Sequence, residues 1–159
     1  MTDVDPTDGR DETLTERMDR NWNELLQELR VAQTGVQILT GFLLTVPFQS
    51  RFTELDDYQR AVYLVLVVLA ITATGLIVAP VSLHRVLFRR HRKESLVSHA
   101  DRLARAGLGV LALVLGGSAL LLFDLVWNRA AGVVAGAAVL VLLAVVWVAI
   151  PVRLARRAE

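Results

Sequence analysis

The chain lacks cysteine altogether, which excludes disulfides, thiolate metal sites and cysteine nucleophiles. Histidine is scarce, and His84, His91 and His99 do not have the spacing of metal ligands on a helix. No pattern typical of a catalytic triad or a phosphate-binding glycine loop is present either. We therefore predict no catalytic residue, no metal site and no bound cofactor, in a protein that is not an enzyme.

Charged side chains are nearly missing from four long stretches, at about residues 31–48, 61–83, 106–126 and 130–152. A helix needs about 20 residues, at 1.5 Å each, to cross a hydrocarbon core of about 30 Å. The chain has 159 residues, 54% of them hydrophobic, and a mean hydropathy of +0.48, which is too apolar to bury these stretches in a core of its own. We predict an all-α polytopic membrane protein with four transmembrane helices over residues 31–152.

The polar segments flank this domain. Residues 1–11 are acidic and nearly free of apolar side chains, which predicts a disordered tail, and residues 153–159 form a basic tail. Over residues 12–30, Leu14, Met18, Trp22 and Leu25 recur at steps of three and four, which predicts an amphipathic helix. This helix either docks a cytoplasmic partner, or lies on the lipid headgroups or extends the first span.

Lysine and arginine are distributed unevenly about the four spans. Fourteen of them lie in the terminal segments and in the loop at 84–105, and three lie in the other two connections. The positive-inside rule then places both termini and the 84–105 loop in the cytoplasm. Five aromatic residues fall at the expected outer ends, as residues of an interfacial aromatic belt do: Phe48, Phe52, Tyr58, Tyr63 and Trp127.

A basic cluster occupies the 84–105 loop. It consists of Arg85, Arg89, Arg90, Arg92 and Lys93. Juxtamembrane cations gain about 1 kcal/mol each beside anionic headgroups, so we interpret the cluster as a contact for anionic lipid. Nucleic acid is the alternative partner, and we do not predict it because the chain has no folded soluble module.

The first span differs from the others in its polar side chains. Gln33, Gln37, Thr40 and Thr45 follow steps of three to five residues, which places them along one stripe of a helix. The stripe forms hydrogen bonds between helices, or else it lines a polar pathway or binds a ligand headgroup. The second interpretation gives our alternative function, a small oligomeric channel or transporter.

Asp124 is the only acidic residue within an apolar run, and Arg129 follows five residues later. An intramembrane carboxylate is by default a candidate for moving protons or ions, although pairing across the short turn is open to this one. After the turn, Gly132 and Gly136 have the spacing of small residues at a helix contact. They favour packing within the last hairpin, with homodimerisation through the same face as the alternative.

Three stretches of the chain resemble a known family. They read "ERMDRNWNELLQELRVAQTGVQILTGFLLTVPFQSRF", "YQRAVYLVLVVLA" and "APVSLHRVLFRRHRKESLV". The chain resembles small actinobacterial integral membrane proteins that form a domain family of unknown function. This resemblance implies four spans and a bacterial inner (plasma) membrane, and it supplies no activity. We predict a non-enzymatic membrane module that interacts with a partner protein or anionic lipid, and the alternative to a protein partner is a homo-oligomer.

Overall fold

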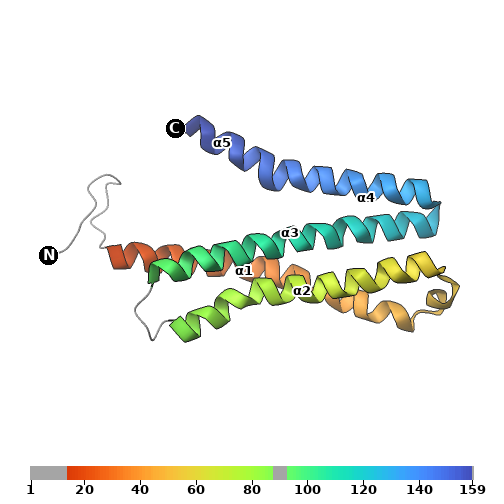
Figure 1. Ribbon diagram of the computed structural model, residues 1–159, viewed down its shortest axis with the longest axis horizontal. Coiled ribbons are helices and arrows are strands. Elements are labelled where there is room, and N and C mark those ends of the chain that lie inside the picture. Colours follow the sequence, from red (N-terminus) through yellow and green to blue (C-terminus); the bar gives the residue numbers. More distant parts are fainter. Residues whose placement is uncertain (1–13, 88–92, 159) are drawn as a thin grey trace.

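The computed structural model describes residues 14–87 and 93–158, and within helices the side chains of residues 14–19, 21–23, 25, 83–87, 93–99 and 158 lie outside the description. Its helices α1 (Leu14–Thr45), α2 (Asp57–Leu87) and α3 (Lys93–Val126) run in alternating directions (Figure 1). α4 (Arg129–Ala144) runs opposite to α3, and α5 (Ile150–Ala158) continues in the direction of α4. Among the described residues, four stretches are long and apolar enough to cross a membrane: Leu26–Phe48, Asp57–Ser82, Ala100–Val126 and Arg129–Arg157. The predicted all-α fold with four such helices is confirmed.

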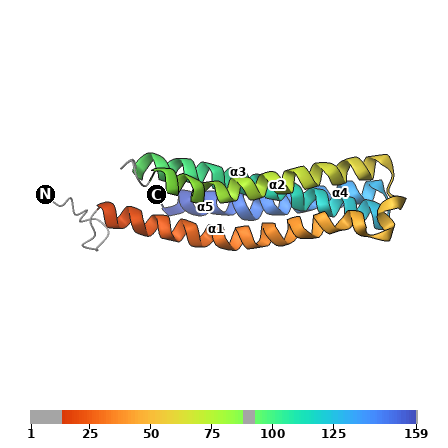
Figure 2. The same cartoon turned by 90° about the horizontal axis from the view of Figure 1, so that it is seen from below.

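The helices form an open bundle with α3 at its centre. α3 packs along α2 on one side and along α4 on the other, while α1 lies against α2 and touches α3 less. Figures 1 and 2 show both short connections, α1 to α2 and α3 to α4, at one end, which we call the turn end. The opposite end, which we call the basic end, carries Arg153, Arg156 and Arg157 of α5.

α1 continues well beyond its apolar part. The helix begins at Leu14, whereas the stretch able to span a membrane begins at Leu26. The 12 residues before Leu26 add about 18 Å of helix at 1.5 Å per residue. The predicted amphipathic segment therefore extends the first span without a break. The side chains of Leu14, Met18, Trp22 and Leu25 lie outside the described residues, so the docking surface assigned to them stays a prediction.

Small side chains let the helices approach closely within the core. Near the basic end, Leu29 and Val36 of α1 pack with Ala73 and Ile77 of α2 and with Ala104 of α3. Nearer the turn end, a second cluster is formed by Leu43, Tyr63, Leu66, Ala70 and Val114. Because each cluster joins α1, α2 and α3, these three helices form one packed unit.

Tyr63 was predicted at the membrane interface, and this prediction is wrong. Its side chain is buried, and its hydroxyl donates a hydrogen bond of 2.8 Å to the carbonyl oxygen of Leu43. The last carbonyl groups of a helix lack partners within it, so Tyr63 supplies one to α1 near the point where the helix ends. The ring also meets Phe52 edge to face, at 5.2 Å between centroids. Phe48 and Trp127 are largely exposed, as interfacial side chains are.

The last span is interrupted by one turn of π-helix, η4 (Val145–Ala149), and α5 bends away from α3 beyond it (Figure 1). Pro151 lies two residues beyond the end of this turn. Proline has no N–H group and its ring crowds the preceding turn, which disturbs the regular hydrogen bonding of a helix. A wide turn accommodates such a disturbance without ending the helix. α4 and α5 therefore separate from α3 toward the basic end.

Candidate polar site at the turn end

Asp124 lies at the end of α3 and is only 8% exposed. Both of its carboxylate oxygens have partners from other helices. Gln59 of α2 donates from Nε2 to Oδ2 over 3.2 Å, and Nε of Arg129 in α4 lies 3.6 Å from Oδ1. The sequence-based expectation that Asp124 can pair across the turn agrees with this geometry. Gln59 was not anticipated.

Arg129 connects this carboxylate to the beginning of α2. Its Nη2 atom donates to Oδ2 of Asp56 over 2.8 Å. Its guanidinium also lies 3.9 Å from the ring centre of Tyr58, which is a cation–π contact. One arginine at the start of α4 thus holds the end of α3 and the start of α2 together.

Asp56 and Gln59 bind each other at the start of α2. The Oδ1 atom of Asp56 accepts from the backbone N–H of Gln59 over 2.8 Å, and Oε1 of Gln59 accepts from the backbone N–H of Asp56 over 3.1 Å. This reciprocal pair is a capping box, and the signal for it is the spacing in the "DDYQ" sequence at 56–59. Sequence reasoning overlooked Asp56 and Gln59, although this pattern could have identified both, and it assigned Tyr58 only to the interfacial aromatic belt.

Acid is expected to weaken the turn end through Asp56. The backbone N–H of Gln59 and the neighbouring Arg129 lower the pKa of this carboxyl below its usual 3.8 in the folded chain. The unfolded chain therefore binds the proton first, and the stabilisation is present above pH 3.8 and is lost as the pH falls through the lower, folded pKa. The melting temperatures of the native chain and of Asp56→Asn should differ most above this pH and converge below it. A difference that grows on acidification would contradict the assignment.

The geometry of this network is more typical of a structural link between the ends of α2, α3 and α4 than of a transport site. Each carboxylate has a hydrogen-bond donor and a cation beside it, so neither is held as an isolated charge ready to take up an ion. Within residues 14–87 and 93–158, no three His, Cys, Asp or Glu side chains are grouped so that they could hold a metal ion. A role for Asp124 in moving protons or ions stays a prediction.

The polar stripe of the first span is divided in the structure. Thr40 faces α2, where its hydroxyl lies 3.4 Å from that of Thr74 while it donates to the carbonyl oxygen of Val36. Gln33 is half-buried, Gln37 is exposed, and Thr45 is exposed and donates to Phe42 of its own helix. Of the four predicted residues, only Thr40 makes a polar contact with another helix in the described part of the chain.

The predicted lipid-binding cluster falls at the edge of what the structure describes. Arg89, Arg90 and Arg92 lie outside the described residues. Arg85 belongs to α2 and Lys93 begins α3, and their side chains also lie outside the description. The contact with anionic lipid therefore stays a prediction.

Comparison with known proteins places the chain in a family without assigning an activity. Residues 11–151 match the family of unknown function DUF6328, and the chain belongs to this family. No curated protein and no solved structure matches the chain. The match covers all four candidate spans except the last residues of the fourth.

Proposed function

We propose that this chain is a multi-pass protein of the bacterial inner membrane that has no enzymatic activity and engages anionic lipid or a partner protein at its basic end. The observation that carries the proposal is the length of the helices at that end. α1 begins 12 residues before its span, and α3 begins seven residues before its own. Both helices therefore reach beyond the hydrocarbon core on one side of the membrane.

The charge distribution supports a cytoplasmic position for this end. Both termini and the 84–105 loop belong to it, and these segments carry fourteen of the 17 lysines and arginines. Leu29 of α1 and Ala104 of α3 lie near the starts of the two spans and belong to one buried cluster, so α1 and α3 are packed together just inside their extensions. The termini and the loop also carry twelve of the 16 aspartates and glutamates, nine of them before residue 31, so the positive excess lies in the 84–105 loop and in residues 153–159. These two parts suit binding to an anionic surface.

Thiol labelling tests this orientation, since the native chain has no cysteine. A membrane-impermeant maleimide applied to intact cells is expected to label Thr53→Cys in the turn end. Ser95→Cys in α3 is expected to react only after the cells are permeabilised. Labelling of Ser95→Cys in intact cells, with Thr53→Cys protected, would reverse the orientation and remove the cytoplasmic interaction surface.

Purification in mild detergent tests the interaction itself. Lipid and protein retained by the native chain are identified by mass spectrometry and compared with those retained by a variant carrying Arg89→Gln, Arg90→Gln and Arg92→Gln. We expect the variant to retain less anionic phospholipid or to lose a specific protein, and we expect neutral lipid to be unchanged. Identical retention by both chains would show that the basic cluster is not the interaction surface.

One observation favours the alternative of an oligomeric channel or transporter. Gln37 is exposed in the middle of a membrane-spanning stretch, and its amide has no hydrogen-bond partner among the described residues. A polar group in hydrocarbon is stabilised when a neighbouring helix supplies a partner, as α1 of a second copy would. If Gln33→Leu with Gln37→Leu left the fold intact but abolished ion flux into liposomes, the channel would replace our first proposal.

A further inference from the structure

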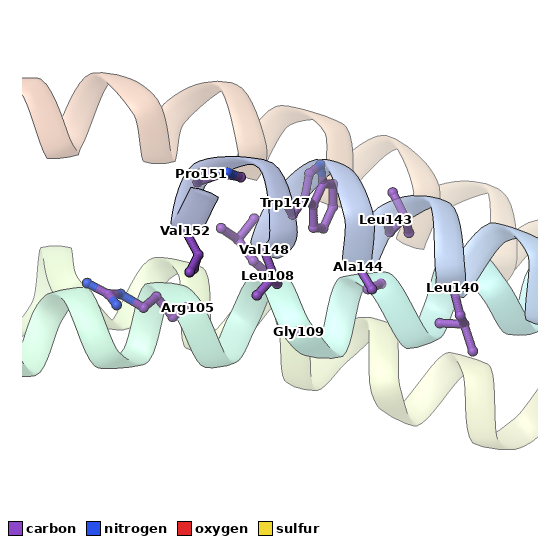
Figure 3. A pocket seen from close by; sticks show the side chains of 11 residues that line it. Arg105, Leu108, Gly109, Leu140, Leu143, Ala144, Trp147, Val148, Pro151 and Val152 are labelled. Atoms are coloured by element: carbon purple, nitrogen blue, oxygen red, sulfur yellow. The ribbon is translucent and has the colours of Figure 1, made fainter. Parts of the chain in front are cut away.

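A long apolar groove of about 630 Å³ lies between α3 and the continuous helical run of α4, η4 and α5, toward the basic end (Figure 3). Its walls include Leu108 and Gly109 of α3 and Leu143, Trp147 and Val148 of the last span. The volume falls within the range of about 300–1,000 Å³ that is typical of small-molecule sites.

The groove results from the sequence of the last span and of the facing α3 turn. The π-turn and Pro151 direct α5 away from α3, which opens the space. Gly109 leaves it unfilled, because a Cβ atom built at this position would meet nothing within 4 Å. By contrast, Gly132 and Gly136 are in direct contact with α3 where the two helices converge. The groove is therefore wedge-shaped, closed toward the turn end and open toward the basic end.

Positive charge stands at the open end. Arg105 lines the groove there, and its side chain points along α3 toward the basic end (Figure 3). Asp101 binds Arg105 through Nε at 2.9 Å and through Nη2 at 2.6 Å. A guanidinium has five N–H groups, so three remain for another acceptor, and the side chain is 77% exposed. Arg156 lies one helical turn beyond Val152, on the face of α5 that continues the groove wall.

We infer that this groove binds one anionic glycerophospholipid, with an acyl chain along Leu108, Leu143 and Trp147 and the phosphate at Arg105 and Arg156. The groove is apolar along its length and polar at one end only, which matches a molecule with an apolar chain and a single charged head. Arg105 lies five residues inside the beginning of the third span, about 8 Å along the helix. An arginine at that depth extends toward the interface, where lipid phosphates lie.

The carboxylate of Asp101 would repel a bound anion. The neighbouring charges therefore decide whether the net charge at the open end of the groove is positive. It neutralises Arg105 in part, whereas Arg153, Arg156 and Arg157 on α5 leave the described part of this end with a positive excess. Arginine binds phosphate through paired, charge-assisted hydrogen bonds, which favours an anionic head over a zwitterionic one. The inference rests on the membrane location that the proposed function gives the chain. The residues that would bind the phosphate are different from those of the 85–93 cluster.

Trp147 reports on the groove directly. The full chain carrying Trp22→Phe and Trp127→Phe is reconstituted in symmetric phosphatidylcholine vesicles, in which orientation has no influence. Phosphatidylglycerol or phosphatidylcholine with brominated acyl chains is then added as a minor component. We expect brominated phosphatidylglycerol to quench Trp147 at a concentration roughly tenfold lower than brominated phosphatidylcholine does. The reason is that a charge-assisted hydrogen bond to arginine is strong enough to change an affinity by about that factor.

Two variants distinguish a specific lipid site in the groove from non-specific contact between Trp147 and bilayer lipid. Asp101→Asn with Arg105→Gln leaves the net charge unchanged, and we expect it to abolish the preference for phosphatidylglycerol. Gly109→Leu fills the groove without a backbone clash, and we expect it to reduce quenching by the anionic lipid. Its matched control is Gly75→Leu, where a Cβ atom also meets nothing within 4 Å and which does not line the groove.

The outcomes are distinct. Equal quenching by the two headgroups would mean that only ordinary bilayer lipid touches Trp147, and a preference that survives Asp101→Asn with Arg105→Gln would mean that the phosphate lies elsewhere. Blue-shifted emission with no quenching would place protein, such as a second copy, in the groove. Each of these results overturns the inference. A lipid preference at Trp147 together with identical retention by the native chain and the Arg89→Gln, Arg90→Gln, Arg92→Gln variant would exclude the 85–93 cluster as the interaction surface and leave the groove site standing.

Discussion

Replacing Gly132 with alanine is expected to lower the free energy of unfolding by about 1–3 kcal/mol, the usual range for overpacking a close contact. A Cβ atom at this position would lie 2.6 Å from the carbonyl oxygen of Leu120 and 3.0 Å from the backbone nitrogen of Asp124. Both are backbone atoms of α3, so a side-chain rotation cannot relieve the overlap. The two helices of the hairpin must move apart.

Reversible unfolding in mixed detergent micelles measures this effect. Gly109→Ala is the matched control, because a Cβ atom at Gly109 meets nothing within 4 Å and alanine favours a helix by up to about 1 kcal/mol over glycine. We expect the control to be neutral or stabilising. If Gly132→Ala instead kept full stability and only lowered the oligomeric state, the glycine face would serve a contact between copies and not the hairpin.

The hairpin shows how far the sequence could predict the fold. The spacing of Gly132 and Gly136 indicated a close helix contact but left its partner open, since a second copy offers the same surface. The structure places both glycines, buried, against Gly116, Leu120 and Asp124 of α3. The short link at Trp127 and Asn128 explains this outcome, because the neighbouring helix of the same chain is always present at high effective concentration.

The existence of the spans was predictable, and their limits were less so. Long apolar runs identify a membrane helix because the bilayer excludes charge, whatever the helix contacts. The runs do not show where a helix begins or ends, since backbone hydrogen bonding continues through polar residues. α1 accordingly starts at Leu14, and α3 starts at Lys93, ahead of the apolar runs at 31–48 and 106–126.

Whether a side chain contacts another helix depends on where the neighbouring helix lies. The sequence of a single helix does not show this. The stripe from Gln33 to Thr45 shares one side of α1, yet of its four polar side chains only Thr40 meets a polar side chain of α2 in the described part of the chain. The groove beside Trp147 was not predictable at all, because it depends on how far α5 diverges from α3. The contact of Asp56 with Arg129 joins residues 73 positions apart, and no local pattern predicts such a pair.

Replacing Arg129 with methionine is expected to destabilise the turn end by about 1–3 kcal/mol. Removing one partner of a buried ion pair costs about 3–5 kcal/mol when the remaining charge stays unpaired, and this value must be reduced here because the arginine side chain is 50% exposed. The side chain of Asp124 is only 4% exposed, so its carboxylate would keep Gln59 as a hydrogen-bond donor and lose its cation. Asp56 and the ring of Tyr58 would lose the same partner.

Unfolding in mixed micelles again provides the measurement. Arg51→Met is the matched control, since Arg51 is an exposed arginine in η2 (Ser50–Glu54) at the same end of the bundle.

The decisive comparison adds Asp124→Leu to Arg129→Met. If the network is a structural link, removing the buried carboxylate as well should restore much of the lost stability, because an apolar pair replaces a charge without a counterion. No recovery would mean that Arg129 acts mainly through Asp56 and Tyr58. If the double variant folds as well as the native chain but has lost a transport activity measured in liposomes, Asp124 is a functional carboxylate and the link is secondary.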